Sequence, residues 1–149
     1  MVIPEIPQNS LTQEIKEIVR LSKKLCDEHD FRFPPPATEA EILVQEQEIN
    51  AKIPESYKDW LRFSNGVQLN GLLVKFLGVK TIGKGRQNIS DEYIVIASVI
   101  GDGEFLCFSK ETGDIAWEDH GKIKKYGTFD LFLRRFIIPS LKVDACEGE

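Results

Sequence analysis

The chain has 149 residues, of which 42% are hydrophobic and 29% are charged, a composition typical of one globular domain. Its net charge of −5 argues against nucleic acid as a direct ligand, because phosphate contacts need clustered lysine and arginine side chains. The longest apolar run, residues 94–100, is far shorter than the roughly 20 residues of a membrane-spanning helix, so we expect no membrane partner.

The N-terminal sequence and the cysteines both favour a cytoplasmic location. Residues 1–11 lack the basic and apolar segments of a secretory signal. Cys26, Cys107 and Cys146 are odd in number and widely separated, which favours reduced thiols over a disulfide framework. Cys107 lies within an apolar run and is expected in the core, whereas Cys146 stands in an acidic segment and is expected to be exposed.

The first predicted helix follows Ser10. Ser10 and Gln13 have the spacing of a capping box, in which each side chain accepts a hydrogen bond from the other's backbone N–H. The prolines at 34–36 end the segment, since proline cannot continue a helix. We therefore expect residues 1–33 to form a helical extension packed on the domain. Residues at helical spacing predict its buried face: Leu11, Ile15, Ile18, Val19, Leu25 and Cys26.

Residues 36–66 predict two helices in tandem. Thr38 and Glu41 have capping-box spacing at the start of the first helix. Pro54 is expected just inside the start of the second, where its fixed φ and missing N–H are tolerated. The Asn65-Gly66 pair is expected to end that helix with positive φ angles. The predicted buried residues are Ile42, Ile49 and Ile53 in the first helix and Tyr57, Trp60, Leu61 and Ser64 in the second.

From residue 67 onward the hydrophobic period changes from helical to strand-like. Asn70-Gly71 indicates a two-residue hairpin turn, and residues 80–88 indicate a basic loop. The next apolar segment has no polar face, which predicts a central strand covered on both sides. Tight glycine turns connect it to two further strands, so an antiparallel meander is predicted over residues 93–100, 104–109 and 114–120.

A last helix is predicted after Thr128, which is expected to cap it. Its core-facing residues are Phe129, Phe132, Leu133 and Phe136, and Pro139 is expected to end it. Residues 140–149 are expected to form a flexible tail. N-terminal helices, then an antiparallel meander, then a C-terminal helix predict a single domain of the α+β class.

These motifs, in this order, resemble the SUKH superfamily. The Pro-Ala-Thr-Glu opening at 36–39, the Ile-Pro-Glu-Ser-Tyr hinge at 53–57 and the Phe-Ser-Asn-Gly exit at 63–66 carry the resemblance. Residues 101–121 add a Gly-Asp-Gly turn, an aromatic strand, a Thr-Gly turn and a strand that ends in Trp and Asp-His. The resemblance spans residues 34–139, most of the chain.

The resemblance implies a non-enzymatic protein-binding domain without a cofactor. The superfamily includes the yeast Smi/Knr-type regulator of cell-wall glucan synthesis and bacterial proteins predicted to give immunity against polymorphic toxins. It therefore implies an immunity protein that occludes a cognate nuclease-type toxin, with a regulatory scaffold of the glucan-synthesis type as the alternative. Ser109 departs from the family pattern, which more often has an acidic residue there.

The residues themselves indicate neither a catalytic triad nor a metal site. His120 beside Asp119 invites a Ser-His-Asp interpretation, but strand neighbours point to opposite faces and a Gly-x-Ser-x-Gly elbow is missing. The Cys and His residues are scattered without zinc-ligand spacing. The Gly83-Lys84-Gly85-Arg86 segment leads into a strand, whereas a phosphate-binding loop opens a helix. A small-ligand pocket between helix and sheet stays open as a further alternative.

The carboxylates of residues 101–120 indicate a surface for a basic protein, since only Lys110 opposes them. On a rigid sheet they would steer the basic active site of a nuclease-type toxin. They would also suit a solvated sheet edge that prevents aggregation. Trp60 and Trp117 favour structural roles, with Trp117 at least half buried. The candidate contact residues are Asp102, Glu104, Asp114, Glu118, Asp119 and His120.

Overall fold

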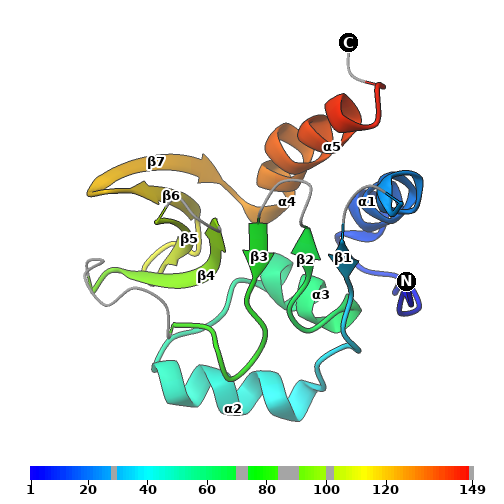
Figure 1. Cartoon of the computed structure of the whole chain (residues 1–149). Coiled ribbons are helices and arrows are strands. Elements are labelled where there is room, and N and C mark those ends of the chain that lie inside the picture. The colour runs from blue at the N-terminus through cyan, green and yellow to red at the C-terminus, as the bar shows by residue number, and fades with distance from the viewer. Residues whose placement is uncertain (28–29, 70–73, 84–90, 100–102, 148–149) are drawn as a thin grey trace.

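A computed structural model describes residues 1–27, 30–69, 74–83, 91–99 and 103–147. It confirms the α+β class, because helices pack around one antiparallel sheet and a helix closes the chain (Figure 1). The predicted Asn70-Gly71 turn, most of the predicted basic loop and Asp102 lie outside the described residues. The helices are α1 (Thr12–Leu25), α2 (Glu39–Ile49), α3 (Glu55–Phe63), α4 (Phe129–Phe132), a π-helical turn (Leu133–Ile137) and α5 (Ile138–Asp144).

The described strands form one antiparallel seven-stranded sheet in chain order. Three consecutive buried residues, Val95, Ile96 and Ala97, show that the middle of β4 is covered on both faces, as predicted. Register shifts in the β4–β5 and β6–β7 pairs mark bulges at Ile96 of β4 and Tyr126 of β7, and bulges increase the local twist of a sheet. The strands are β1 (Phe31–Arg32), β2 (Gln68–Leu69), β3 (Val74–Phe76), β4 (Tyr93–Val99), β5 (Glu104–Ser109), β6 (Ile115–Asp119) and β7 (Lys122–Gly127).

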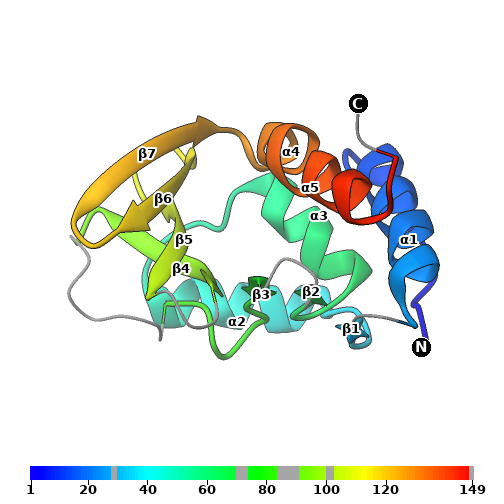
Figure 2. The same cartoon turned by 45° about the horizontal axis from the view of Figure 1, so that its top comes forward.

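The layers are clearest when two views are compared (Figures 1 and 2). The longer strands β4–β7 curl together on one side of the molecule, and α2 runs along one end of it. The helices α1 and α5 lie side by side at the opposite end, where they contact each other. Within the described residues, every helix is too short or too polar to span a bilayer.

Buried aromatic rings join the helices to the sheet. The ring of Phe129 in α4 packs against Tyr57 and Trp60 of α3 and against Phe76 of β3, and Trp60 also packs against Phe76. The ring centroids in these four contacts are 5.0–5.8 Å apart. These contacts are edge-on, the arrangement that aromatic quadrupoles favour. The predicted burial of Tyr57, Trp60, Leu61 and Ser64 is confirmed, as is that of Ile42 and Ile53, while Ile49 is partly buried.

The start of α1 differs from the prediction. The helix begins at Thr12, and its N-cap residue, Leu11, makes no side-chain cap bond. The Ser10 hydroxyl instead donates a hydrogen bond of 2.5 Å to Asp59 Oδ2 in α3. The predicted Ser10–Gln13 capping box is therefore wrong, because the Ser10 hydroxyl is hydrogen-bonded to the carboxylate of Asp59, far away in the sequence. Cys26 follows the helix and is exposed, so its predicted place on the buried face is also wrong.

The helix pair begins with the predicted capping box. Glu41 N–H donates to Thr38 Oγ1 at 3.1 Å, and Thr38 N–H donates to Glu41 Oε1 at 2.9 Å. These two bonds satisfy backbone donors that the first turn of a helix leaves free. Pro54 is the N-cap residue of α3 and not its first helical residue, a difference of one position.

The exit from α3 is built around an asparagine side chain. The helix ends at Phe63, and Ser64 is extended with φ of −156°. Gly66 has φ of +101° as predicted, but Asn65 does not have positive φ, so that part of the prediction is wrong. Asn65 Oδ1 accepts a hydrogen bond of 2.8 Å from Val79 N–H. A Cβ on Gly78 would lie 2.3 Å from this oxygen, so glycine is required for the approach.

The last helix does not end at Pro139. Thr128 is its N-cap residue without a side-chain cap bond, and the chain stays helical through the π-helical turn and α5 to Asp144. Pro139 stands in the first turn of α5, where the wider turn before it accommodates a residue that lacks an N–H. The predicted flexible tail is therefore wrong for residues 140–144, and Leu141 is fully buried.

Candidate functional site

The described candidate contact residues lie at two ends of the meander. Glu104 begins β5, Asp119 ends β6 and His120 directly follows it, so the three come together at one end of the sheet. We name these three residues the sheet-end surface. Asp114 precedes β6 at its other end, about 17 Å away along the strand. There it lines a cleft of about 420 Å³ with Ser56, Thr112 and Asp130 among its neighbours.

Glu118 has a structural environment. Glu118 is only 3% exposed, and its Oε2 accepts a hydrogen bond of 2.8 Å from Gly121 N–H in the β6–β7 turn. A buried carboxylate is costly unless hydrogen-bonded, so this contact explains why the side chain can face inward. The expectation that Glu118 contributes to an open acidic surface is wrong.

Glu104 is oriented by a tryptophan. The indole Nε1–H of Trp117 on β6 donates a hydrogen bond of 2.7 Å to Glu104 Oε1. Trp117 is mostly buried, as predicted, with its ring 5.2 Å from that of Phe136. The indole thus fixes one carboxylate oxygen of Glu104 at the surface.

Asp119 and His120 form an exposed pair. Their side chains are 51% and 69% exposed, and 2.7 Å separates His120 Nδ1 from Asp119 Oδ1. The prediction that they diverge is wrong, because His120 follows β6 in a left-handed conformation with φ of +52°, where strand alternation no longer applies. Among the described residues, no hydroxyl or thiol hydrogen-bonds to His120, so the pair lacks the nucleophile of a triad.

The strand β7, which the sequence analysis missed, changes the charge of the meander. In the register of β6 and β7, Lys122 lies opposite Asp119, Lys124 lies opposite Trp117 and Lys125 lies opposite Ala116. The sheet end therefore presents carboxylates next to ammonium groups, and it is not uniformly acidic. A count of charges through residue 120 could not include these lysines.

A second surface lies on α2 and was not predicted from the sequence. Every charged side chain of this helix is a glutamate, at positions 39, 41, 46 and 48. Between them Leu43 and Val44 are 57% and 52% exposed. The signal was present in the sequence, since a buried stripe through Ile42 and Ile49 leaves residues 43 and 44 on the outer side.

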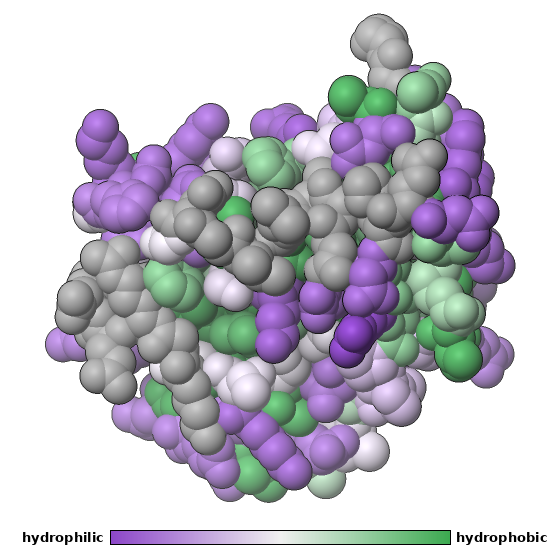
Figure 3. All heavy atoms as spheres, in the orientation of Figure 1, coloured by the Kyte–Doolittle hydropathy of each residue, from purple (hydrophilic) through white to green (hydrophobic). Residues whose placement is uncertain are grey.

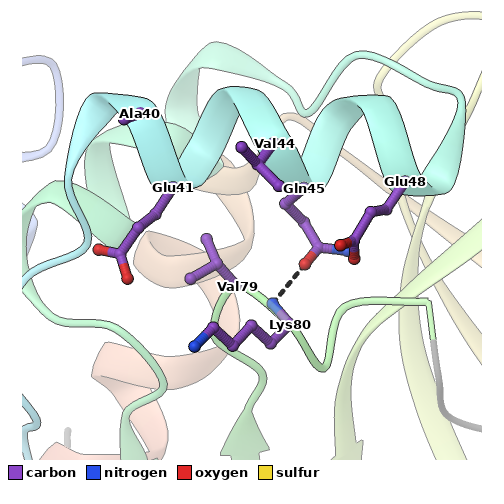
Figure 4. Close-up of a pocket in the computed structure, with 7 residues that line it drawn as sticks. All are labelled: Ala40, Glu41, Val44, Gln45, Glu48, Val79 and Lys80. Carbon is purple, nitrogen blue, oxygen red and sulfur yellow. Dashed lines mark hydrogen bonds between the residues drawn. The ribbon is translucent and has the colours of Figure 1, made fainter.

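A groove of about 210 Å³ runs between α2 and the chain that follows β3 (Figure 4). Gln45 is 2% exposed and holds the two sides together. Its Oε1 accepts a hydrogen bond from Lys80 N–H, and its Nε2 donates to the carbonyl of Ile82 at 3.3 Å. The lining residues are Ala40, Glu41, Val44, Gln45, Glu48, Val79 and Lys80.

Two of the α2 glutamates are already ion-paired. Glu39 is 2.8 Å from Arg62 Nε, and this hydrogen bond lowers the pKa of the glutamate. Glu46 is 3.1 Å from Lys58 Nζ. Glu48, in contrast, makes no hydrogen bond or ion pair within the described ranges, and it faces the groove. Within those same ranges, no group of three His, Cys, Asp or Glu side chains is arranged to hold a metal ion.

A comparison with protein-family models identifies the family of the chain. The sequence model of the SMI1 / KNR4 family (SUKH-1) matches residues 36–135, about two thirds of the chain. The matched region contains α2, α3, the meander and α4. A search of curated proteins found no match. The chain therefore belongs to the SMI1 / KNR4 family (SUKH-1), within the superfamily that its motifs resemble.

Proposed function

We propose that the protein is a non-enzymatic, cytoplasmic binding domain that neutralises a cognate nuclease-type toxin by covering its active site. The observation that carries the proposal is the family match over residues 36–135. The superfamily includes bacterial proteins predicted to give immunity against toxins, and its other branch regulates cell-wall glucan synthesis. The sheet-end surface offers the kind of rigid, exposed charged group that such a role requires.

The geometry of the sheet end supports occlusion as the mechanism. Asp119 and His120 are exposed, and hydrogen bonds of 2.7 Å orient them and Glu104 before any partner arrives. Groups that are already ordered lose little conformational entropy on binding. A specific complex would bury on the order of 1,600 Å² in total, enough to exclude substrate from an active site. The carboxylates of Glu104 and Asp119 would pair with basic groups of the cleft at short range, since the neighbouring Lys122 reduces their long-range attraction.

Neutralisation of the toxin domain encoded beside the gene tests the proposal. We expect the protein to restore growth of cells that express that domain and to form a complex of fixed stoichiometry with it. Asp119→Lys should weaken binding at least about tenfold, since like charges across an interface oppose docking. Glu111→Lys, an exposed change near the opposite end of the meander, is the matched control, and Asp114→Lys tests the cleft beside it.

Failure to bind or neutralise that domain would overturn the proposal. If the purified protein instead captured several unrelated cellular proteins and no toxin gene stood nearby, the scaffold alternative would replace it. Equal loss of binding in Asp119→Lys and Glu111→Lys would show that the sheet end has no special part in docking.

A further inference from the structure

We infer that the groove beside α2 binds a basic segment of a partner protein and seats one apolar side chain of that segment against Val44 and Val79. The inference rests on the proposed function only in that the partner is a protein. It concerns a surface separate from the sheet end, and it specifies the chemistry of the segment that this surface accepts.

The apolar side chains of α2 provide the first argument. Leu43 and Val44 are adjacent and each more than half exposed, although the molecule buries most of its other large aliphatic side chains. Figure 3 shows hydrophobic side chains set among hydrophilic ones over this end of the molecule, at the bottom of the view. A single exposed aliphatic residue needs no explanation, but an exposed pair beside an apolar groove is typical of a binding surface.

The shape of the groove provides the second argument. Ala40 and Val44 line one wall, and Val79 lies on the other (Figure 4). An apolar cavity of about 150 Å³ holds a benzene ring, so a groove of about 210 Å³ has room for one large apolar side chain. The wall at Val79 is held by Asn65 Oδ1, which accepts from Val79 N–H at 2.8 Å. With Gln45 bonded across the groove, both walls are in place before binding.

The charges of the rim determine the kind of segment. Glu41 and Glu48 stand at the two ends of the groove, on one face of α2, because seven residues are nearly two helical turns (Figure 4). Their backbone positions are about 10 Å apart along the helix axis. Lys80 is the single cation among the lining residues that the structure describes, so this described part of the rim carries excess negative charge. A segment with two basic side chains about 10 Å apart and an apolar side chain between them complements it.

The same charges argue against a second copy of this chain as the occupant. Two α2 helices facing each other across a symmetric contact would place glutamates against glutamates, and like-charge contacts are unfavourable. The groove therefore fits a different protein, one that is basic at this contact.

A designed peptide tests the groove on the full-length protein. The probe is an alanine-based helical peptide with one leucine midway between two lysines that are seven residues apart. In an NMR titration we expect shift changes at Ala40, Val44 and Val79. A peptide with glutamates in place of the lysines should not bind. Glu48→Lys should weaken binding at least about tenfold, and added salt should weaken the binding of the lysine peptide, because the rim interaction is electrostatic.

Two exposed valines provide matched variants. Val44→Asp should raise the dissociation constant at least about tenfold, whereas Val143→Asp in α5 should leave it unchanged, since only Val44 lines the groove. Both residues are similarly exposed, so both variants should fold, which circular dichroism can check. Shift changes elsewhere, equal effects of the two substitutions, or no binding at millimolar peptide would overturn the inference.

The neutralisation assay separates this inference from the proposed function. If the wild-type protein neutralises its toxin but the lysine peptide does not bind, the inference fails and the proposed function stands. If no toxin is neutralised but the peptide binds as expected, the proposed function fails and the groove stands. Dimers in sedimentation that Val44→Asp abolishes would show that a second copy occupies the groove, which also overturns the inference.

Discussion

The hydroxyl of Tyr57 in α3 donates a hydrogen bond of 2.6 Å to the carbonyl oxygen of Leu77, the residue after β3. It also lies 3.1 Å from the carbonyl oxygen of Ile96 in β4. The side chain is completely buried, and burial raises the pKa of the phenol well above its usual value, so the hydroxyl stays protonated. One hydroxyl thus connects α3 to the end of β3 and to β4.

Tyr57→Phe should destabilise the protein by about 1–3 kcal/mol, because the Leu77 carbonyl loses a buried donor. The Ile96 carbonyl keeps a partner, since Leu77 N–H donates to it at 2.7 Å. Urea unfolding measures the difference. Tyr93→Phe is the control, since the Tyr93 hydroxyl makes no hydrogen bond among the described residues, and it should change stability by less than about 0.5 kcal/mol. Equal stability of Tyr57→Phe and wild type would contradict the structural role.

Thr38→Ala should cost about 1 kcal/mol of unfolding free energy, since it removes the hydroxyl that accepts from Glu41 N–H at the start of α2. Glu41→Gln keeps an acceptor for Thr38 N–H and should cost less. Thermal unfolding of the two variants gives the comparison. A larger loss in Glu41→Gln than in Thr38→Ala would show that the charge of Glu41, and not the cap, stabilises the helix.

Two thiols should react quickly and one slowly. Cys26 and Cys146 are exposed, whereas Cys107 is fully buried in β5. Burial, together with the nearby Glu118 carboxylate, raises the pKa of the Cys107 thiol to about 12, so little thiolate forms at neutral pH. Titration with a chromogenic disulfide at pH 8 should consume two thiols at once and the third only after denaturant is added. Three fast thiols would contradict the buried position of Cys107.

The stability of the contact between α1 and the C-terminal segment should depend on acid pH. Hydrogen bonds from Arg20 and, to a smaller extent, from Lys24 lower the pKa of Glu147 to about 2. Because the folded-state pKa lies below the unfolded value of about 4.5, this contribution is complete above that value and disappears as pH falls toward 2. Glu147→Gln should therefore lower Tm slightly at pH 6 and leave it unchanged near pH 2.

Glu5→Gln is the control for that experiment, since the exposed Glu5 has no ion pair among the described residues, and it should not alter Tm at either pH. Added salt should also reduce the effect of Glu147→Gln at pH 6, because the ion pair is at the surface. A difference that grows as pH falls would mean that Glu147 does not act through these cations.

Local contacts could be predicted from the sequence, whereas contacts between distant segments could not. The Thr38–Glu41 capping box joins residues three positions apart, and its spacing alone specifies it. Ser10 has equally good local spacing, but its hydroxyl binds Asp59, 49 positions away. Likewise, Pro139 ends a regular helix only if the preceding turn is α-helical, and the π-helical turn removes that condition.

The candidate site was harder to predict for the same reason. The strand β7 lies at the edge of the sheet, where Lys122, Ile123 and Lys124 are all exposed. Its sequence therefore lacks the alternation of apolar and polar residues by which a half-buried strand is predicted. The lysines that modify the charge of the sheet end were therefore missed. The α2 groove depends on hydrogen bonds between Gln45 and the residues Lys80 and Ile82, which lie far along the chain. Only the exposed apolar residues of α2 could therefore have been predicted from the sequence.

The helices α1 and α5 both lie outside the matched residues 36–135, and they pack on each other at one end of the molecule (Figures 1 and 2). Arg20 of α1 also donates a hydrogen bond to Glu147, three residues after the end of α5 and 127 positions away in the sequence. The two flanks of the family domain thus form one structural unit. Cutting back either flank would uncover the apolar face of the other, so a shortened version of this protein must keep both flanks or lose both.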